Sequence, residues 1–120
     1  MATFSKIPLS GSTDGRGIHI DDNATAGKTV HTGPNVATQM DEIWLYAVNY
    51  DTTDRKLTIE WGGATPGGDQ IEYTVKAENG LYLIIPGLII KGNATPLVVA
   101  AFAATTSAIN IFGYVNRITA

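Results

Sequence analysis

Residues 40–63 read MDEIWLYAVNYDTTDRKLTIEWGG, and this stretch decides the fold class. Side chains of a β-strand point alternately to its two faces. In the first half of the stretch this rule puts Trp44 and Tyr46 on one face and Ile43 and Leu45 on the other. Both faces are largely apolar, so we expect this strand to be buried, or covered by a partner, on both sides.

A polar turn and a second strand complete the stretch. Residues 51–54 carry short polar side chains, which bond to nearby backbone and favour a turn. From 55 to 61 the sequence alternates strictly, with Thr58 and Glu60 outward and the apolar positions between them inward. This pattern is typical of an antiparallel strand with one wet face. We therefore predict a hairpin at the centre of the fold.

Turn-forming residues divide the rest of the chain into short strands. In no segment do apolar residues recur with the spacing of an amphipathic helix. Runs of Gly, Pro, Asn and Asp separate the candidate strands, which cover residues 1–10, 17–21, 28–32, 71–75, 81–85, 88–90, 96–103 and 108–118. The ENG sequence at 78–80 predicts a further hairpin turn. The pattern predicts an all-β, single-domain antiparallel β-sandwich or jelly roll of about eight to nine short strands. Residues 1–17 would form an N-terminal arm or edge segment and residues 18–120 the sandwich.

Composition excludes several classes of function. A chain of 120 residues with a net charge of −3 and no basic run lacks the cations that bind nucleic acid through its phosphates. The absence of cysteine excludes disulfides, thiolate metal sites and cysteine nucleophiles. The longest apolar run, residues 97–104, is far shorter than the roughly 20 residues of a membrane-spanning helix. We expect no nucleic-acid or membrane partner, and synthesis in the cytoplasm without an export signal.

Two motifs could hold a phosphate or a metal ion, but a plainer interpretation fits each better. The Gly27-Lys28-Thr29 sequence matches the end of a phosphate-binding loop, yet Asp22 stands where that motif needs its first glycine, which favours a turn. The two histidines, His19 and His31, are close in sequence to acidic residues, Asp21, Asp22 and Asp41. Their spacings match no compact ligand motif, so surface histidines are expected, with no metal and no cofactor.

Candidates for catalysis are equally weak. Ser10, Ser12 and Ser107 lie in predicted loops without the pattern of an activated nucleophile. Glu60 and Glu72 could face each other as a carboxylate pair on neighbouring strands, although solvated charges on a sheet face explain them more simply. We therefore assign no catalytic residue and expect that the chain is not an enzyme.

The aromatic residues give a stronger functional signal. Most of them fall on core positions by alternation, but the second faces of two strands carry Trp44 with Tyr46 and Phe112 with Tyr114. If these faces point outward, they form an aromatic row of the kind that marks a partner interface or a carbohydrate platform. The alternative, a core covered on both sides, remains open at this point.

Four segments together carry a family resemblance. They are IPLSGSTDGRGI at 7–18, DEIWLYAV at 41–48, LTIEWGG at 57–63 and IFGYVNRI at 111–118. The chain resembles small structural proteins of the virions of tailed bacteriophages, in particular marine and cyanobacterial phages, and within them a capsid decoration (cement) protein. The resemblance covers nearly the whole chain.

This resemblance implies a homotrimer on the outside of an icosahedral head, bound to the major capsid protein and stabilising the shell by bridging capsomers. The expected localisation is the capsid surface of the virion. We expect the partner interface to include the apolar anchors and the arginine of the N-terminal segment together with the four outward aromatics: Phe4, Ile7, Leu9, Arg16, Trp44, Tyr46, Phe112 and Tyr114. An ordinary edge strand of the same subunit is the alternative for the N-terminal segment.

A second function belongs to another class. The same sequence fits a carbohydrate- or receptor-binding module of a head fibre or tail, with exposed aromatics around the glycine-rich loop at 62–69. Trp61 and Tyr73 flank that loop and would then contact the glycan.

Overall fold

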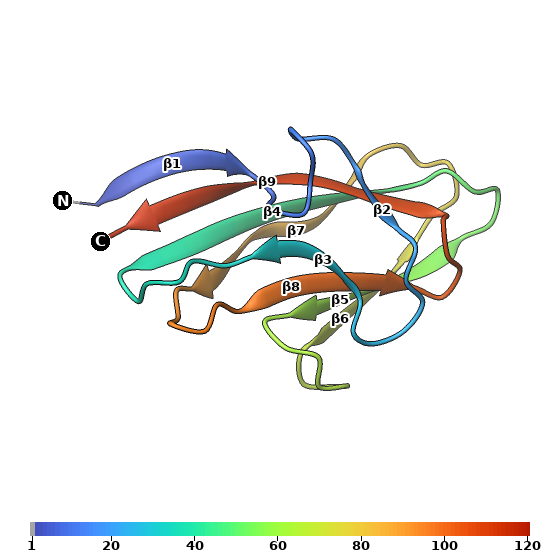
Figure 1. Cartoon of the computed structure of the whole chain (residues 1–120). Coiled ribbons are helices and arrows are strands. Elements are labelled where there is room, and N and C mark those ends of the chain that lie inside the picture. Colours follow the sequence, from blue (N-terminus) through green and yellow to red (C-terminus); the bar gives the residue numbers. More distant parts are fainter. Residues whose placement is uncertain (1) are drawn as a thin grey trace.

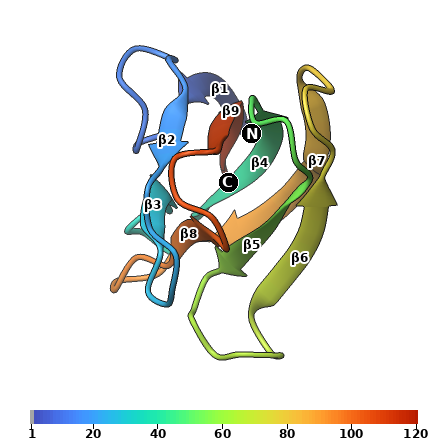
Figure 2. The same ribbon diagram turned by 90° about the vertical axis from the view of Figure 1, so that its right-hand side faces the viewer.

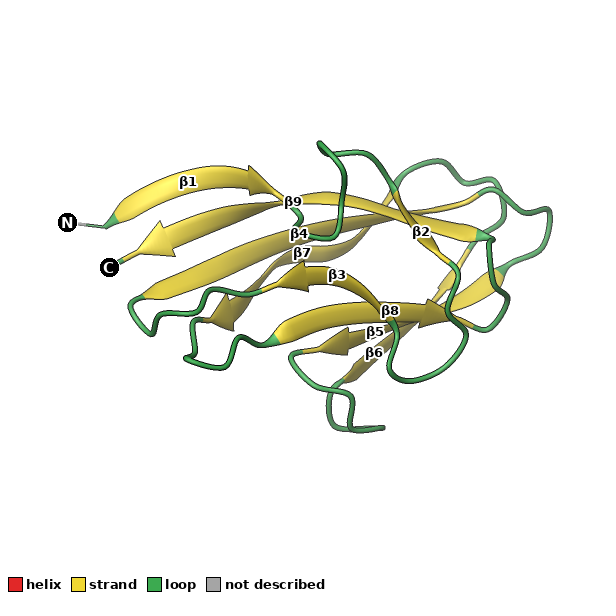
Figure 3. Cartoon of the chain, viewed as in Figure 1, coloured by secondary structure: helices red, strands yellow, loops and turns green. Residues whose placement is uncertain are grey.

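The computed structural model describes residues 2–120, and within them the chain forms nine strands and no helix (Figure 1, Figure 3). In chain order these are β1 (Thr3–Pro8), β2 (Ile18–Ile20), β3 (Lys28–Thr32), β4 (Gln39–Asn49), β5 (Arg55–Trp61), β6 (Gln70–Val75), β7 (Tyr82–Lys91), β8 (Val98–Ala103) and β9 (Ile109–Thr119). No helix suited to crossing a membrane occurs in these residues. Met1, the first residue of the predicted 1–17 segment, lies outside the described part.

Two antiparallel sheets pack against each other, and Figure 2 shows them as separate layers. The first sheet has the order β1-β9-β4-β7, with β2 pairing to β9 beyond the end of β1, and the second has the order β3-β8-β5-β6. The longest pairing joins β4 to β9, from Gln39 opposite Thr119 to Asn49 opposite Ile109. The predicted all-β antiparallel sandwich is confirmed.

The core lies between the two sheets and is filled by alternate positions of their strands. Ile43 and Leu45 of β4 belong to the same buried cluster as Leu57 and Ile59 of β5, each with 1% or less of its surface exposed. Full burial of one such aliphatic side chain contributes about 1.5–3 kcal/mol relative to leaving it in water. The alternation in residues 40–63 thus identified the core side of β5 correctly, whereas for β4 it separated the two faces without indicating which of them is the core.

The predicted central hairpin is wrong. β4 belongs to the first sheet, where it pairs with β7 and β9, whereas β5 belongs to the second, where it pairs with β6 and β8. The polar turn after β4 carries the chain across the core instead of back along the same sheet. The second predicted hairpin turn, at 78–80, likewise joins strands of different sheets, β6 and β7. Crossing over lets the apolar faces of consecutive strands meet in the core.

Alternation predicts that the whole outer face of β5 is wet, but only Lys56 at its start is exposed. Thr58 is 3% exposed and Glu60 is 2% exposed. Glu60 lies under the turn before β3, where the Gly27 amide donates a hydrogen bond to Glu60 Oε1 at 2.8 Å. Thr58 lies opposite the bulky Phe102 of β8. Neighbouring segments therefore cover part of a face that the sequence pattern assigns to solvent.

The N-terminal segment is an edge strand of the same subunit in this structure. β1 pairs with β9 along its whole length, from Thr3 opposite Thr119 to Pro8 opposite Tyr114. The loop that follows is held to β3, because the Gly11 amide donates to the Val30 carbonyl at 2.9 Å. The two ends of the chain therefore lie side by side (Figure 1).

Candidate functional site

The outer face of the first sheet gathers four of the residues predicted to contact a partner. Trp44 lies directly opposite Tyr114, and Tyr46 lies directly opposite Phe112, across the β4–β9 pairing. All four side chains are half-buried. We call this set (Trp44, Tyr46, Phe112 and Tyr114) the aromatic face. The expected burial of β4 on both sides is therefore incomplete: its inner face is closed, whereas its outer face keeps contact with solvent.

Polar contacts fix the centre of the aromatic face. The rings of Trp44 and Tyr114 are stacked, with centroids 6.1 Å apart and planes 8° from parallel. Glu42 accepts hydrogen bonds from Trp44 Nε1 at 2.8 Å and from Asn116 Nδ2 at 3.0 Å. The bond from Trp44, followed by the bond from Asn116, lowers the pKa of Glu42. Lys6 Nζ lies 4.8 Å from the centre of the Tyr114 ring, in a cation–π contact.

The margins of the aromatic face carry exposed apolar side chains. Phe4 lies on the same side of β1 as Lys6, two residues away, and is 69% exposed. On the opposite margin, Leu83 of β7 pairs with Tyr46 and is 39% exposed. Exposed apolar side chains therefore lie on both sides of the aromatic face, on β1 and on β7.

The other residues predicted in the N-terminal segment have different positions. Arg16 is exposed and lines a hollow that also contains Phe112, so it lies at the rim of the aromatic face. Ile7 is half-buried and packs against the core. Leu9 is 1% exposed and belongs to the core, so its prediction as a partner anchor is wrong. The chain turns inward after Pro8, and Leu9 fills space between the sheets.

Trp61 and Tyr73, the residues considered for glycan contact, are engaged within the chain. Both are half-buried and pack against the core. Trp61 Nε1 donates to the carbonyl of Ile89 at 3.3 Å. Tyr73 stacks on Tyr82 of β7, with centroids 5.1 Å apart. These aromatics close the edge between the two sheets.

A second cluster, which the sequence analysis missed, is buried between the sheets. His31 is 1% exposed and Asp41 is 0% exposed, so the prediction of a surface histidine is wrong for His31. Asp41 Oδ2 lies 2.6 Å from His31 Nε2, and both Asp41 oxygens accept from Arg117, at 2.8 and 2.9 Å. His19 is exposed, as predicted, and lies 2.8 Å from Asn110 Oδ1.

The protonation of this cluster follows from its contacts. The Ser10 amide donates to His31 Nδ1 at 3.0 Å, so the imidazole carries its proton on Nε2 and donates it to Asp41. Burial lowers the pKa of His31 and outweighs the opposing hydrogen bond to Asp41. Burial alone would raise the pKa of Asp41, but the hydrogen bonds from Arg117 and His31 outweigh it and leave that pKa lowered.

The cluster resembles a histidine–aspartate pair of a catalytic triad but lacks its chemistry. Both imidazole nitrogens are engaged, one by the Ser10 amide and one by Asp41, so no lone pair is free to activate a nucleophile. The Ser10 hydroxyl accepts from the Thr32 amide at 2.7 Å instead of contacting the ring. Within residues 2–120, no group of three or more acidic or histidine side chains is placed to hold a metal ion.

The two glutamates considered as a carboxylate pair have different environments. Both lie on the outer face of the paired strands β5 and β6. Glu72 is exposed and forms an ion pair with Lys56 at 2.8 Å, whereas Glu60 is buried. The Gly27 amide, which a phosphate-binding loop would offer to a phosphate, donates to Glu60 instead. Residues 24–26 form a bend and Lys28 and Thr29 already belong to β3, so these residues do not form a phosphate-binding loop.

No protein-family model matches the sequence, and no curated protein matches it. Among solved structures, the chain is similar to one containing the CBM22-1 and GH10 modules of endo-1,4-beta-D-xylanase 10B from Clostridium thermocellum, complexed with xylohexaose. The identity is 9% and the TM-score is 0.36, over 99% of this chain and 24% of that chain. The chain therefore spans about a quarter of the length of that protein, and a match at this level assigns no family.

Proposed function

We propose that the chain is a non-enzymatic structural protein of a tailed-phage virion that decorates the outside of the capsid. The resemblance of its four sequence segments to virion proteins gives the class. The aromatic face gives the observation that carries the proposal, because four aromatic side chains of one sheet remain half-exposed around the stacked pair Trp44 and Tyr114. In this proposal the face contacts the major capsid protein, and the subunit acts as a homotrimer.

The chemistry of the aromatic face suits such a contact. Tyrosine, tryptophan and phenylalanine are enriched at interfaces, since each buries a large apolar area with little loss of side-chain freedom. Here the β4–β9 ladder holds their backbones in register, and the Glu42 contacts hold the Trp44 ring. Little ordering would be needed on binding, which keeps its entropic cost low.

Decoration would stabilise the shell by mass action. A protein that binds the assembled lattice and not its dissociated subunits shifts the equilibrium toward the lattice. Three copies joined in a trimer would bind with a high effective concentration once the first contact has formed, so individually weak contacts suffice.

The number of copies of this chain in purified virions tests the proposal, measured by quantitative mass spectrometry against the major capsid protein. We expect a ratio near one, as for a protein that coats the lattice. A ratio well below one, close to that of tail or vertex components, would contradict decoration. Light scattering of the purified chain tests the trimer separately.

Carbohydrate or receptor binding is the second candidate, and one observation favours it. The stacked rings of Trp44 and Tyr114 lie beside the polar groups of Glu42 and Asn116, an arrangement suited to stacking and hydrogen bonding with a sugar ring. Calorimetric titration with host surface polysaccharide tests it. Binding that is lost in Tyr114→Ala and kept in Trp61→Ala would place the glycan on the aromatic face, and the absence of binding would exclude this candidate.

A further inference from the structure

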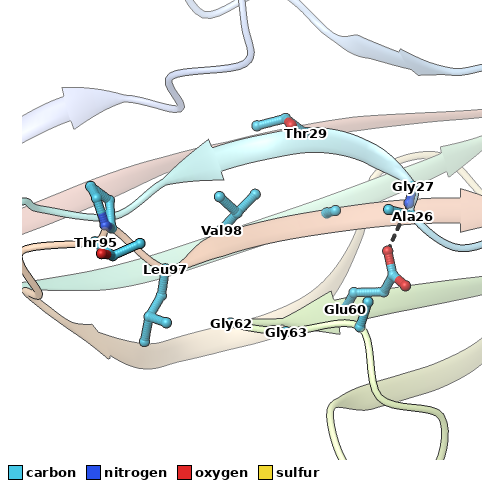
Figure 4. A pocket seen from close by; sticks show the side chains of 12 residues that line it. Ala26, Gly27, Thr29, Glu60, Gly62, Gly63, Thr95, Leu97 and Val98 are labelled. Atoms are coloured by element: carbon cyan, nitrogen blue, oxygen red, sulfur yellow. Dashed lines mark hydrogen bonds between the residues drawn. The ribbon is translucent and has the colours of Figure 1, made fainter.

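A hollow of about 310 Å³ lies on the outer side of the second sheet, away from the aromatic face. It runs between the turn before β3 and the segment before β8 (Figure 4). Ala26 and Gly27 lie at one end and Thr95 and Leu97 at the other, with Val98 between them (Figure 4). The twelve lining residues are small or apolar, apart from two threonines and one acid, and none of them is basic.

The acid is Glu60, and only one of its two carboxylate oxygens accepts a hydrogen bond. Oε1 accepts from the Gly27 amide at 2.8 Å. Oε2 is buried and has no hydrogen-bond partner within residues 2–120. Figure 4 shows the carboxylate at the Gly27 end of the hollow, with only Oε1 bonded. A buried carboxylate oxygen without a donor is unfavourable, because it has lost its hydration and gained nothing in return.

The basic residues on neighbouring segments do not neutralise Glu60, because other acids hold them. Lys28, which follows Gly27, pairs with Asp21 at 3.3 Å. Lys56, on the same strand as Glu60, pairs with Glu72 at 2.8 Å. Neither lysine therefore forms an ion pair with Glu60, and a cation from outside the chain could do so.

We infer that this hollow binds a primary ammonium group on a short aliphatic stem, and that a rotation of the Glu60 carboxylate brings Oε2 to accept a hydrogen bond from the ammonium. The cation supplies the missing donor and the missing charge together. The stem would lie along Val98 and Leu97, where the lining is apolar. The side chain of lysine in a partner protein and a free alkylamine share this chemistry. The inference concerns the second sheet and does not depend on the proposed capsid role.

Titration with n-butylammonium chloride tests the inference, followed by the backbone amide resonances of the ¹⁵N-labelled protein at constant ionic strength. We expect saturable shifts at Gly27, Val98 and Ala100. n-Butanol has the same stem without the charge and should bind at least tenfold more weakly. Equal binding of the alcohol, or shifts that do not saturate, would overturn the inference.

Two variants locate the binding group. Glu60→Gln keeps an oxygen for the Gly27 amide and removes the charge, so it should weaken n-butylammonium at least tenfold. Glu78→Gln removes an exposed acid from the turn before β7, which does not line the hollow, and should leave the affinity unchanged. Equal loss in both variants would mean non-specific attraction and would overturn the inference. Val98→Phe fills the middle of the hollow, away from the end where the Glu60 carboxylate lies, and should also abolish binding, which keeps the test decisive if Glu60→Gln folds poorly.

A further titration distinguishes between a protein lysine and a free alkylamine as the source of the ammonium group. N-acetyl-lysine N-methylamide presents the lysine side chain with its backbone blocked, as in a protein. Binding at least as tight as that of n-butylammonium supports a protein lysine as the occupant. Binding of the free amine alone supports the same chemistry with a small metabolite as its source. The absence of binding by both compounds overturns the inference.

Discussion

His31 and Asp41, ten residues apart in sequence, form a buried contact of 2.6 Å between Nε2 and Oδ2. Asp41 also takes two hydrogen bonds from Arg117, and the Ser10 amide occupies the other imidazole nitrogen. β3 and the last part of β9 are thereby joined to the start of β4 through one carboxylate. Because both His31 and Asp41 are buried, their protonation is tied to the stability of the fold.

The stability of the protein should fall on acidification from pH 7 to pH 5. In the unfolded chain His31 has its ordinary pKa of 6.5, whereas burial lowers the pKa in the folded state. Between pH 6.5 and the lower pKa of the folded state, the unfolded chain therefore binds a proton that the folded protein does not. The free energy of unfolding then falls by at most about 1.4 kcal/mol for each pH unit of acidification. Asp41 contributes below this window, because its pKa is lowered from 3.8 and its stabilisation is lost only as the pH falls further. Urea unfolding at several pH values measures the slope.

His31→Gln should reduce that slope, since glutamine can donate to Asp41 and does not titrate. The variant should be less stable at pH 7, where it loses the bond from Ser10. His19→Gln is the matched control, because His19 is exposed and should leave the slope as it is. An unchanged slope in His31→Gln would show that another group causes the pH dependence.

Replacing Arg117 by alanine should cost about 3 kcal/mol of unfolding free energy. The change leaves the buried carboxylate of Asp41 without its bidentate partner, and an uncompensated buried charge is strongly destabilising. Arg55→Ala removes a similar two-bond pair with Asp51 that is partly exposed, and should cost about 1 kcal/mol or less. Similar losses in both variants, measured by urea unfolding, would contradict the importance of burial at Asp41.

Gly113→Ala should disrupt the first sheet. A Cβ at this position would overlap the carbonyl oxygen of Trp44, so β4 and β9 would have to separate at the centre of their pairing. We expect a loss of at least about 3 kcal/mol. Gly68→Ala is the control, because a Cβ there meets nothing closer than 3.6 Å. Thermal unfolding of both variants distinguishes the two positions, and an equal small effect would mean that the sheet accommodates the methyl group.

Phe4→Asp tests the aromatic face without disturbing the fold. Phe4 is 69% exposed, so the substitution should leave the melting temperature nearly unchanged. If the face contacts the capsid, a charge at its margin should weaken binding to purified expanded shells about tenfold or more in a co-sedimentation assay. Thr74→Asp, at an exposed position of the second sheet, should bind as the wild type does. Wild-type binding by Phe4→Asp would remove β1 from the contact.

Most of the strands could be predicted from the sequence, because each has a local pattern bounded by turn residues. Residues 28–32 were predicted with the bounds that β3 has, and β5 and β9 differ from prediction by about one residue at most. Pairing could not be predicted in the same way. Local alternation at 40–63 indicates only that each strand has an apolar side to bury. A hairpin within one sheet and a connection between two sheets both bury these sides.

The candidate sites show the same limit. Alternation predicted that Trp44, Tyr46, Phe112 and Tyr114 share the second face of their strands, and the β4–β9 register brings them together. It did not predict the burial of Glu60, since the turn that covers it comes from thirty-three residues earlier in the sequence. The pairing of His31 with Asp41 was also missed, because each lies in a polar context that normally indicates solvent. In both cases a segment that is distant in sequence covers the residue, and this burial cannot be seen in the local pattern.

The adjacency of Thr3 and Thr119 determines how the protein would bear mechanical load. A force applied between these two residues acts across the β1–β9 ladder at its end, so the hydrogen bonds would break one after another as the strands peel apart. A force applied through the aromatic face and the opposite end of β4 acts along the strands and loads many bonds at once. A subunit anchored by its sheet face would therefore resist a pulling force far better than one held by its termini.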